Sequence, residues 1–191
     1  MNKLPRILIF IGTTLIVLSL VLFTYIFAPV AREEINYAIN KPKSSEIKPT
    51  DKDFGIVIPK IGANAKIISQ VDPYDSKAYQ VALTKGVAQA KGTATPDQAG
   101  NMFLFSHSSV NLLEASRFNS IFFLLSKLNI GDEIDIYYKN SKYKYKVSEV
   151  KTAEASDISY LDPNSDTQTL TLMTCWPPGT TFKRLLVIAK Q

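Results

Sequence analysis

Cysteine, histidine and tryptophan are almost absent from this sequence, which has one residue of each among 191. A single cysteine can form neither an intrachain disulfide nor a structural zinc site built on several thiolates. A lone cysteine in a folded protein is usually buried and inert, so only its surroundings can indicate that Cys175 is reactive. The carboxylates are not clustered as calcium ligands would be. We therefore expect no metal and no other cofactor.

Dense runs of one charge are also missing. The formal net charge is +5, from 22 lysine and arginine residues against 17 aspartate and glutamate residues, and the basic residues are scattered singly. Nucleic-acid binding requires a clustered basic face. We therefore expect no nucleic-acid partner, and we read the small positive excess as a property of an ordinary solvated surface.

One long apolar segment lies near the N-terminus. No charged residue interrupts Ile7 to Ala28, and a helix of this length, at about 1.5 Å per residue, crosses a hydrocarbon core of about 30 Å. Lys3 and Arg6 precede the segment, and Pro29 is expected to end the helix. A cleavable signal peptide is the alternative, but its apolar core is usually shorter. Residues 1–31 are therefore predicted to form a transmembrane anchor with a short cytoplasmic tail.

The segment after the anchor is polar. Residues 32–52 contain Pro42 and Pro49 together with lysines and serines. Glu33, Glu34 and Ile35 could extend a short helix, and the remainder is expected to act as a linker. Basic residues flank the apolar span on both sides, so charge alone does not decide its orientation. Because long domains translocate largely regardless of charge, we expect the folded domain, residues 53–191, to be extracellular and held on the cell membrane by this single span.

Residues 53–191 show mainly the two-residue alternation and the short apolar runs that are typical of β-strands. Gly131-Asp132 and Asn140-Ser141 supply turn residues between them. Many short strands at this spacing favour an all-β fold that closes, or nearly closes, into a barrel. The expected strands cover residues 54–59, 65–68, 101–105, 133–138, 142–147, 169–173 and 185–189.

One helix is predicted within this domain. Apolar residues recur there at helical spacing on a single face, which indicates core packing rather than a ligand-binding site. They are Phe118, Ile121, Phe122, Leu125 and Leu128. Two shorter helical segments are expected at residues 76–83 and 112–116. The domain should therefore combine its strands with one or more short helices.

The single cysteine and the single histidine each lie where a predicted strand ends, and an arginine opens the last strand. A free thiol is only a few per cent thiolate at neutral pH, and a neighbouring histidine or arginine favours the thiolate. Histidine can also exchange a proton with a leaving amine, and a fixed guanidinium can stabilise a tetrahedral oxyanion. Brought together, Cys175, His107 and Arg184 would meet the requirements of thiol-based acyl transfer.

Several segments in a fixed order resemble the sortase family. Thr171-Leu172-Met173-Thr174-Cys175 is followed by Arg184 and preceded by His107, which is the order found in that family. The resemblance extends over residues 53–190. Other segments similar to sortase motifs are residues 56–62 at the first strand, 86–88, 100–103 and 127–134.

The resemblance implies an eight-stranded β-barrel of the sortase type and a cysteine transpeptidase. Cys175 would attack a carbonyl within a Leu-Pro-x-Thr-Gly-like sorting signal at the C-terminus of a surface protein, giving a thioacyl enzyme. His107 would protonate the leaving amine and activate the incoming amine of a cell-wall precursor or a pilin lysine. Arg184 would hold the oxyanion or position the substrate. Thr174 and Trp176, beside the nucleophile, are further candidates for substrate binding, and packing is an equal alternative for Trp176.

Two departures from the family pattern leave the subclass open. Ser106 precedes the histidine where sortases often carry glycine or alanine. Asp72-Pro73-Tyr74 resembles the lid motif of pilin-polymerising sortases, but it follows the first strand and is interpreted as a turn.

Three alternative functions are compatible in part with the same residues. A thiol hydrolase would pass the acyl group to water, and a non-catalytic, membrane-tethered binding barrel would not need the thiol. A cysteine transpeptidase that cross-links peptidoglycan is disfavoured, because Met173-Thr174 precede Cys175 instead of a Ser-x-Gly motif.

Overall fold

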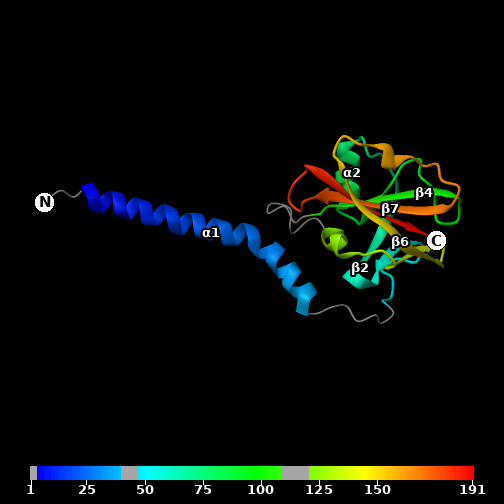
Figure 1. The fold of residues 1–191 in the computed structure, drawn as a ribbon, viewed down its shortest axis with the longest axis horizontal. Helices are drawn as coiled ribbons and strands as arrows, with labels where there is room; N and C mark the ends of the chain where they lie inside the picture. The colour runs from blue at the N-terminus through cyan, green and yellow to red at the C-terminus, as the bar shows by residue number, and fades with distance from the viewer. Residues whose placement is uncertain (1–3, 40–46, 109–120) are drawn as a thin grey trace. The chain divides into compact units, whose positions relative to one another are not determined.

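The computed structural model describes residues 4–39, 47–108 and 121–191 (Figure 1). The chain divides into two compact units, residues 1–40 and residues 41–191. In these described ranges, the first unit is one long helix and the strands all belong to the second unit.

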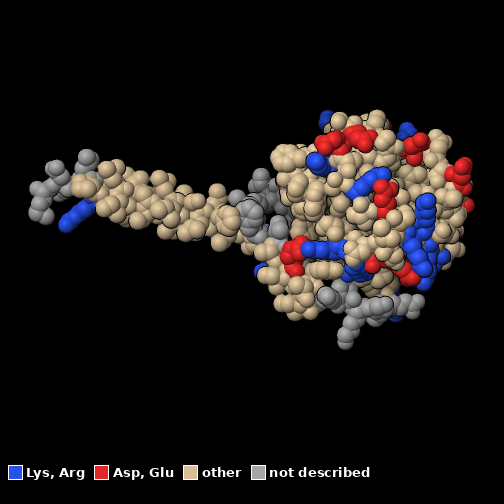
Figure 2. Space-filling model, viewed as in Figure 1, with Lys and Arg blue, Asp and Glu red and all other residues tan. Residues whose placement is uncertain are grey.

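The N-terminal unit is the helix α1 (Leu4–Ile39). Its segment Pro5–Tyr25 is long and apolar enough to cross a membrane, with a mean hydropathy of 2.6. No charged residue follows Arg6 within it, and the face that Figure 2 shows is almost entirely uncharged beyond the N-terminal end. The expectation that Pro29 ends the helix is wrong, because the backbone remains helical as far as Ile39. A proline removes one helical hydrogen bond, but good helix formers follow it and propagate the helix. The first part of the expected linker is therefore helical.

The second unit is a closed barrel of eight strands in the order β1-β2-β3-β4-β7-β8-β6-β5 (Figure 1), which confirms the predicted all-β barrel. The short strand β3 was not predicted, because four residues are too few to show a periodicity. It pairs in parallel with β2 and antiparallel with β4. The strands are β1 (Phe54–Ile58), β2 (Ala63–Val71), β3 (Val87–Ala90), β4 (Gly100–Phe105), β5 (Glu133–Tyr138), β6 (Ser141–Glu154), β7 (Gln168–Trp176) and β8 (Lys183–Lys190).

Short helices connect these strands. The helix α2 (Ser76–Leu83) has the predicted bounds, and it begins after Asp75, whose carboxylate accepts hydrogen bonds from the amides of Lys77 and Ala78. The described residues of the unit also form three short 3₁₀-helices: η1 (Pro59–Ile61), η2 (Phe123–Lys127) and η3 (Ser159–Leu161).

The predicted amphipathic helix is a 3₁₀-helix in its described part, which is η2. Phe122, Leu125 and Leu128 are buried, which confirms their assignment to the core. Their spacing of three residues matches the three residues per turn of a 3₁₀-helix. Phe118 and the helical segment expected at residues 112–116 lie outside the described residues.

Gly86 comes directly before β3 and has no room for a side chain. A Cβ atom at this position would lie 2.2 Å from the carbonyl oxygen of Lys66 on β2. Gly86→Ala is therefore expected to force β2 and β3 apart and to lower the free energy of unfolding by about 1–3 kcal/mol. Chemical denaturation of the full chain in detergent measures this change. The exposed neighbour provides a control, Lys85→Ala, and equal stability of the two variants would contradict the prediction.

Asp51 ties the segment before β1 to β2. Its carboxylate accepts hydrogen bonds from the amides of Phe54 (3.1 Å) and Asp53 (2.7 Å), and it forms an ion pair with Lys66 (3.1 Å). The Phe54 amide, followed by Lys66, lowers the pKa of Asp51 below its usual value of 3.8. A carboxyl group with a lowered folded-state pKa contributes stability above its unfolded-state pKa, and this stability is lost as the pH falls through the folded-state pKa.

Asp51→Asn should therefore destabilise the protein most at neutral pH. The difference from the unsubstituted chain should shrink as the pH falls below about 4, where the carboxylate becomes protonated in both states. Denaturant unfolding at pH 7 and at pH 2.5 measures this difference, with Asp53→Asn as the control. If the variant loses the same amount of unfolding free energy at both pH values, the charge of Asp51 is not the source of the loss.

Candidate active site

Cys175 and Arg184 lie directly opposite each other on the antiparallel strands β7 and β8. Leu172 and Val187 are fully buried in the barrel, so the alternation of each strand places both Cys175 and Arg184 on its outer face. The distance between Arg184 Nη1 and Cys175 Sγ is 3.7 Å. A guanidinium at this distance from the sulfur is placed to stabilise negative charge that develops in a reaction at the thiol.

The guanidinium of Arg184 is also held by the backbone. Its Nη1 donates to the carbonyl oxygen of Thr181 at 3.1 Å and to that of Lys183 at 3.2 Å. These bonds turn the side chain back over the β7–β8 connection and fix its head group beside the thiol. A planar guanidinium with five donors can make these contacts and still present N–H groups to a substrate.

His107 reaches the same place from a different strand. It follows β4, which pairs in parallel with β7, with Phe105 opposite Met173. The amide of Ser106 continues this pairing by donating to the carbonyl oxygen of Met173 at 3.2 Å. His107 follows Phe105 by two residues, and Cys175 follows Met173 by two residues. The parallel register therefore brings the imidazole level with the thiol.

His107, Cys175 and Arg184 line one cleft of about 330 Å³. Residues of α2 and the turn before it line the cleft, as do residues of η3 and the segment just before it. Its other walls are mainly apolar, as is typical of ligand sites that contain a few placed polar groups. They include Tyr74, Tyr79, Leu83, Ile158, Leu161 and Met173. The structure thus brings the three predicted catalytic candidates together.

Thr174 and Trp176 are not among the described residues that line this cleft. Thr174 is 1% exposed, and its hydroxyl donates to the carbonyl oxygen of Ser106 at 2.9 Å. Trp176 pairs with Lys183 on β8. Both residues neighbour Cys175 on a strand, and they therefore project to the opposite face of the sheet. The observed contact of Thr174 stabilises the approach of β4 to β7.

The prediction that Asp72-Pro73-Tyr74 forms a turn is confirmed, and part of this turn lines the cleft. It lies between β2 and α2, and its Pro73 and Tyr74 line the cleft. The resemblance of this tripeptide to a lid motif therefore coincides with a position at the cleft, although the segment follows β2 in the chain.

Tyr160 on η3 is a residue of the cleft that sequence reasoning did not identify. It is one of nine tyrosines, and no motif surrounds it. Its ring stacks on Phe103, with 5.6 Å between the ring centroids and 16° between the planes. Burial raises the pKa of Tyr160, and the positive charge of Arg184 acts in the opposite direction. Tyr160 lines the cleft together with Arg184 and Cys175.

Comparison with known proteins now places this site in a family. Residues 56–191 match the family model described as "Sortase domain". This match covers more than half of the chain, and the chain therefore belongs to the sortase family. Sortases are generally cysteine transpeptidases that act at the cell surface on surface-protein substrates and amine acceptors.

Individual relatives agree with this assignment. The chain is 26% identical to sortase D of Bacillus subtilis (strain 168) over 155 residues, which cover 79% of this chain and 70% of the relative. The structure of a Clostridium perfringens sortase D5 transpeptidase is similar with a TM-score of 0.59 and 28% identity, and the match covers 83% and 91% of the two chains. The pilus-related sortase C of Group B Streptococcus has a TM-score of 0.61 with coverage of 87% and 89%; at 22% identity it supports the fold alone.

Proposed function

We propose that this protein is a membrane-anchored cysteine transpeptidase that cleaves a Leu-Pro-x-Thr-Gly-like sorting signal and transfers the acyl group to an amine. The observation that carries the proposal is the 3.7 Å contact between Arg184 and Cys175 in a cleft that His107 also lines. A thiol, an imidazole and a guanidinium at one site supply the nucleophile, the proton carrier and the oxyanion donor of acyl transfer.

In the first step, the Cys175 thiolate attacks the scissile carbonyl carbon, and a carbon–sulfur bond forms. The carbonyl oxygen becomes an oxyanion, which the Arg184 guanidinium stabilises. The carbon–nitrogen bond of the peptide then breaks while His107 gives a proton to the leaving amine. The product of this step is a thioacyl enzyme and a free C-terminal fragment of the sorting signal.

In the second step, an amine attacks the thioester carbonyl. His107, neutral after the first step, accepts the proton of the amine as the new carbon–nitrogen bond forms. The carbon–sulfur bond breaks, and the released Cys175 thiolate lies beside the Arg184 guanidinium again. The apolar walls of the cleft suit the leucine and proline side chains of a sorting signal. The acceptor is the amine of a cell-wall precursor or of a pilin lysine.

The N-terminal helix supports a membrane location for this enzyme. Its segment Pro5–Tyr25 satisfies the length and composition of a membrane span. We assign residues 1–31 to the anchor with its cytoplasmic tail, residues 32–52 to the linker and residues 53–191 to the extracellular catalytic domain. A protease added to intact cells should remove the catalytic domain, and its protection would reverse the orientation.

Mass spectrometry of Cys175 tests the chemistry directly. The full chain in detergent is mixed with a Leu-Pro-x-Thr-Gly peptide, with and without an added amine, and a scrambled peptide is the control. A thioester mass on Cys175 and incorporation of the amine into the product are expected. Cleavage that never incorporates an amine would instead assign a thiol hydrolase. The absence of both cleavage and thioester would contradict acyl transfer at this site.

A further inference from the structure

We infer that Thr180 is a further positioning residue: its hydroxyl closes the turn from which the carbonyl oxygen of Thr181 holds the Arg184 guanidinium beside Cys175. This inference rests on the proposed function, because the roles of Arg184 and Cys175 belong to that proposal. It gives the connection between β7 and β8, residues 177–182, a task in the site.

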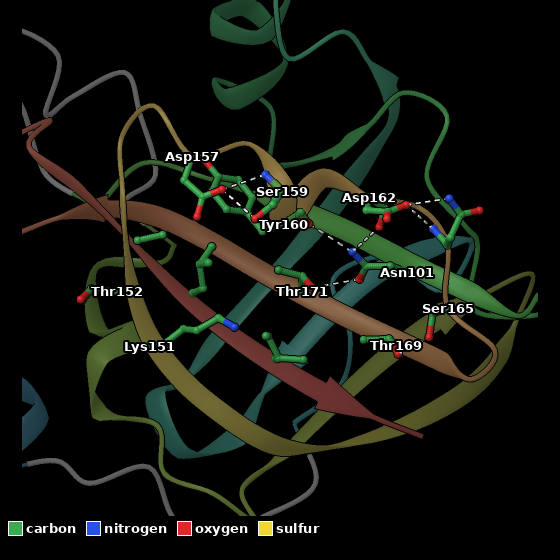
Figure 3. Close-up of a pocket in the computed structure, with 14 residues that line it drawn as sticks. Asn101, Lys151, Thr152, Asp157, Ser159, Tyr160, Asp162, Ser165, Thr169 and Thr171 are labelled. Carbon is green, nitrogen blue, oxygen red and sulfur yellow. Dashed lines mark hydrogen bonds between the residues drawn. The ribbon is translucent and has the colours of Figure 1, made fainter.

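The connections before and after β7 are held in different ways. The connection between β6 and β7 is tied to β4 by Asn101, whose Nδ2 donates to the carbonyl oxygens of Tyr160 (3.3 Å) and Asp162 (3.2 Å). Figure 3 shows both bonds, which fix this connection from outside. In residues 177–182, the hydrogen bonds run within the connection itself and to Arg184. The shape of this second connection therefore depends on its own turn.

Residues 177–180 form a β-turn. The amide of Thr180 donates to the carbonyl oxygen of Pro177 at 3.0 Å. Pro178 and Gly179 occupy the two central positions, and Gly179 has a φ of 83°, which is the combination that a type II turn favours. The hydroxyl of Thr180 donates to the same carbonyl oxygen at 2.8 Å. The turn is thus closed twice, once by the backbone and once by a side chain.

The turn decides where the carbonyl group of Thr181 lies. The last paired residues of β7 and β8 are Trp176 and Lys183, so the ladder of hydrogen bonds does not fix Thr181, which lies two residues beyond it. Nη1 of Arg184 donates to the carbonyl oxygens of Lys183 (3.2 Å) and Thr181 (3.1 Å). The first acceptor belongs to the paired strand, whereas the second belongs to the residue after Thr180 and moves with the turn.

The contact with Thr181 matters because the same nitrogen of Arg184 approaches the thiol. Nη1 lies 3.7 Å from the Sγ atom of Cys175. An arginine side chain has many rotamers, and a partly exposed one keeps a single position only if acceptors hold it. Weakening the turn should therefore let the guanidinium move away from the sulfur.

Alkylation of Cys175 by two reagents of different charge tests this inference without any peptide substrate. The thiolate displaces iodide from both iodoacetate and iodoacetamide and forms a carbon–sulfur bond, and the chain has no other cysteine to react. Iodoacetate is an anion and iodoacetamide is neutral, so a guanidinium near the sulfur attracts only the first. The ratio of the two rates therefore reports the position of Arg184, and the thiolate fraction cancels because it affects both reactions alike.

The variants are compared as full chains in detergent. Arg184→Gln should lower the iodoacetate-to-iodoacetamide ratio about 3–6-fold, the effect of removing a unit charge about 4 Å away in water. Thr180→Val keeps the shape of the side chain but removes the hydroxyl, and it should lower the ratio about 2-fold, because the backbone bond still closes the turn in part. Thr180→Ser keeps a hydroxyl and should restore the ratio.

Thr84→Val is the matched control. The hydroxyl of Thr84 also donates to a carbonyl oxygen three residues earlier, that of Val81, at 2.7 Å. Thr84 is not among the described residues that line the cleft, so this variant should leave the ratio unchanged.

Gly179→Ala tests the turn independently of the hydroxyl. A Cβ atom would have open space at this position, but a φ of 83° strains a residue that carries a side chain. The variant should therefore loosen the turn and lower the ratio by about 2-fold. A lowered unfolding temperature with an unchanged ratio would limit the turn to a structural role and overturn the inference.

A double-mutant cycle shows whether Thr180 acts through Arg184. In an Arg184→Gln background, Thr180→Val should change the ratio by less than about 1.3-fold, because the group that it positions is gone. An equal fall in both backgrounds would overturn the positioning role, as would an unchanged ratio for Thr180→Val or a failure of Thr180→Ser to restore it. Because no sorting peptide takes part, a failure of the transpeptidase proposal remains distinguishable from a failure of this inference.

Discussion

Replacing Cys175 by alanine is expected to abolish both thioacyl-enzyme formation and cleavage of a sorting peptide, by on the order of 10⁴-fold or more. The chain has no second cysteine, so no other thiolate can take its place. Chromatography of the peptide products and mass spectrometry of the protein measure the two losses. The thiol is only partly buried, and removing it should therefore have little effect on stability.

The control for Cys175→Ala is its own unfolding midpoint, which should agree with that of the unsubstituted chain. Cys175→Ser is the matched variant, since it keeps the shape of the side chain but replaces the thiolate by a hydroxyl that remains protonated at neutral pH. It should be as inactive as the alanine variant. Cleavage by either protein at a rate near that of the unsubstituted chain would assign the nucleophile to another residue.

Replacing Arg184 by alanine is expected to lower kcat/KM by about 10²–10³-fold, which is the usual effect of removing one oxyanion donor. Most of the loss should appear in kcat, because an oxyanion exists only as the transition state is approached. Steady-state kinetics of peptide cleavage in the presence of an amine measures the two parameters. Larger peptide concentrations should not restore the rate.

Arg184→Lys separates charge from geometry. An ammonium group keeps the charge and could replace the contacts of Nη1 with the Cys175 sulfur and the carbonyl oxygens of Thr181 and Lys183, but it then lacks the further N–H groups that a planar guanidinium offers to an oxyanion. This variant should therefore be closer to the alanine variant than to the unsubstituted chain. Lys183→Ala, which removes the adjacent cation and its 3.3 Å ion pair with Glu154, is the control and should change kcat/KM by less than about 2-fold. Full activity of Arg184→Lys would reduce the role of Arg184 to its charge.

Elements with a strong local pattern were predictable from the sequence. The strand β5 and the helix α2 have the predicted bounds, because the alternation of acidic residues and isoleucines at the start of β5 and the helical character of residues 76–83 are local signals. Two features were not predictable in this way. β3 is a strand through its pairing with β2 and β4, and the helix α1 continues past Pro29 because its neighbours propagate it.

The candidate active site likewise contains residues that the sequence identified and a residue that it did not. Sequence order and residue chemistry identified His107, Cys175 and Arg184 as candidates, since thiol acyl transfer needs these three side-chain types. Tyr160 carried no such mark. It lines the cleft because the connection between β6 and β7 places it there, and a tyrosine in such a position looks like any other in a linear chain.

The amino-acid order alone was enough to establish an apolar span of membrane length and to predict an all-β barrel, because both rest on patterns among near neighbours in the chain. Residue chemistry singled out one thiol with two possible partners. Whether those partners meet the thiol depends on contacts between distant segments. Closure of the barrel pairs β4 in parallel with β7, which brings His107 level with Cys175, and pairs β7 with β8, which sets Arg184 opposite it. Strand order and register are properties of the whole sheet, and they became visible only in three dimensions.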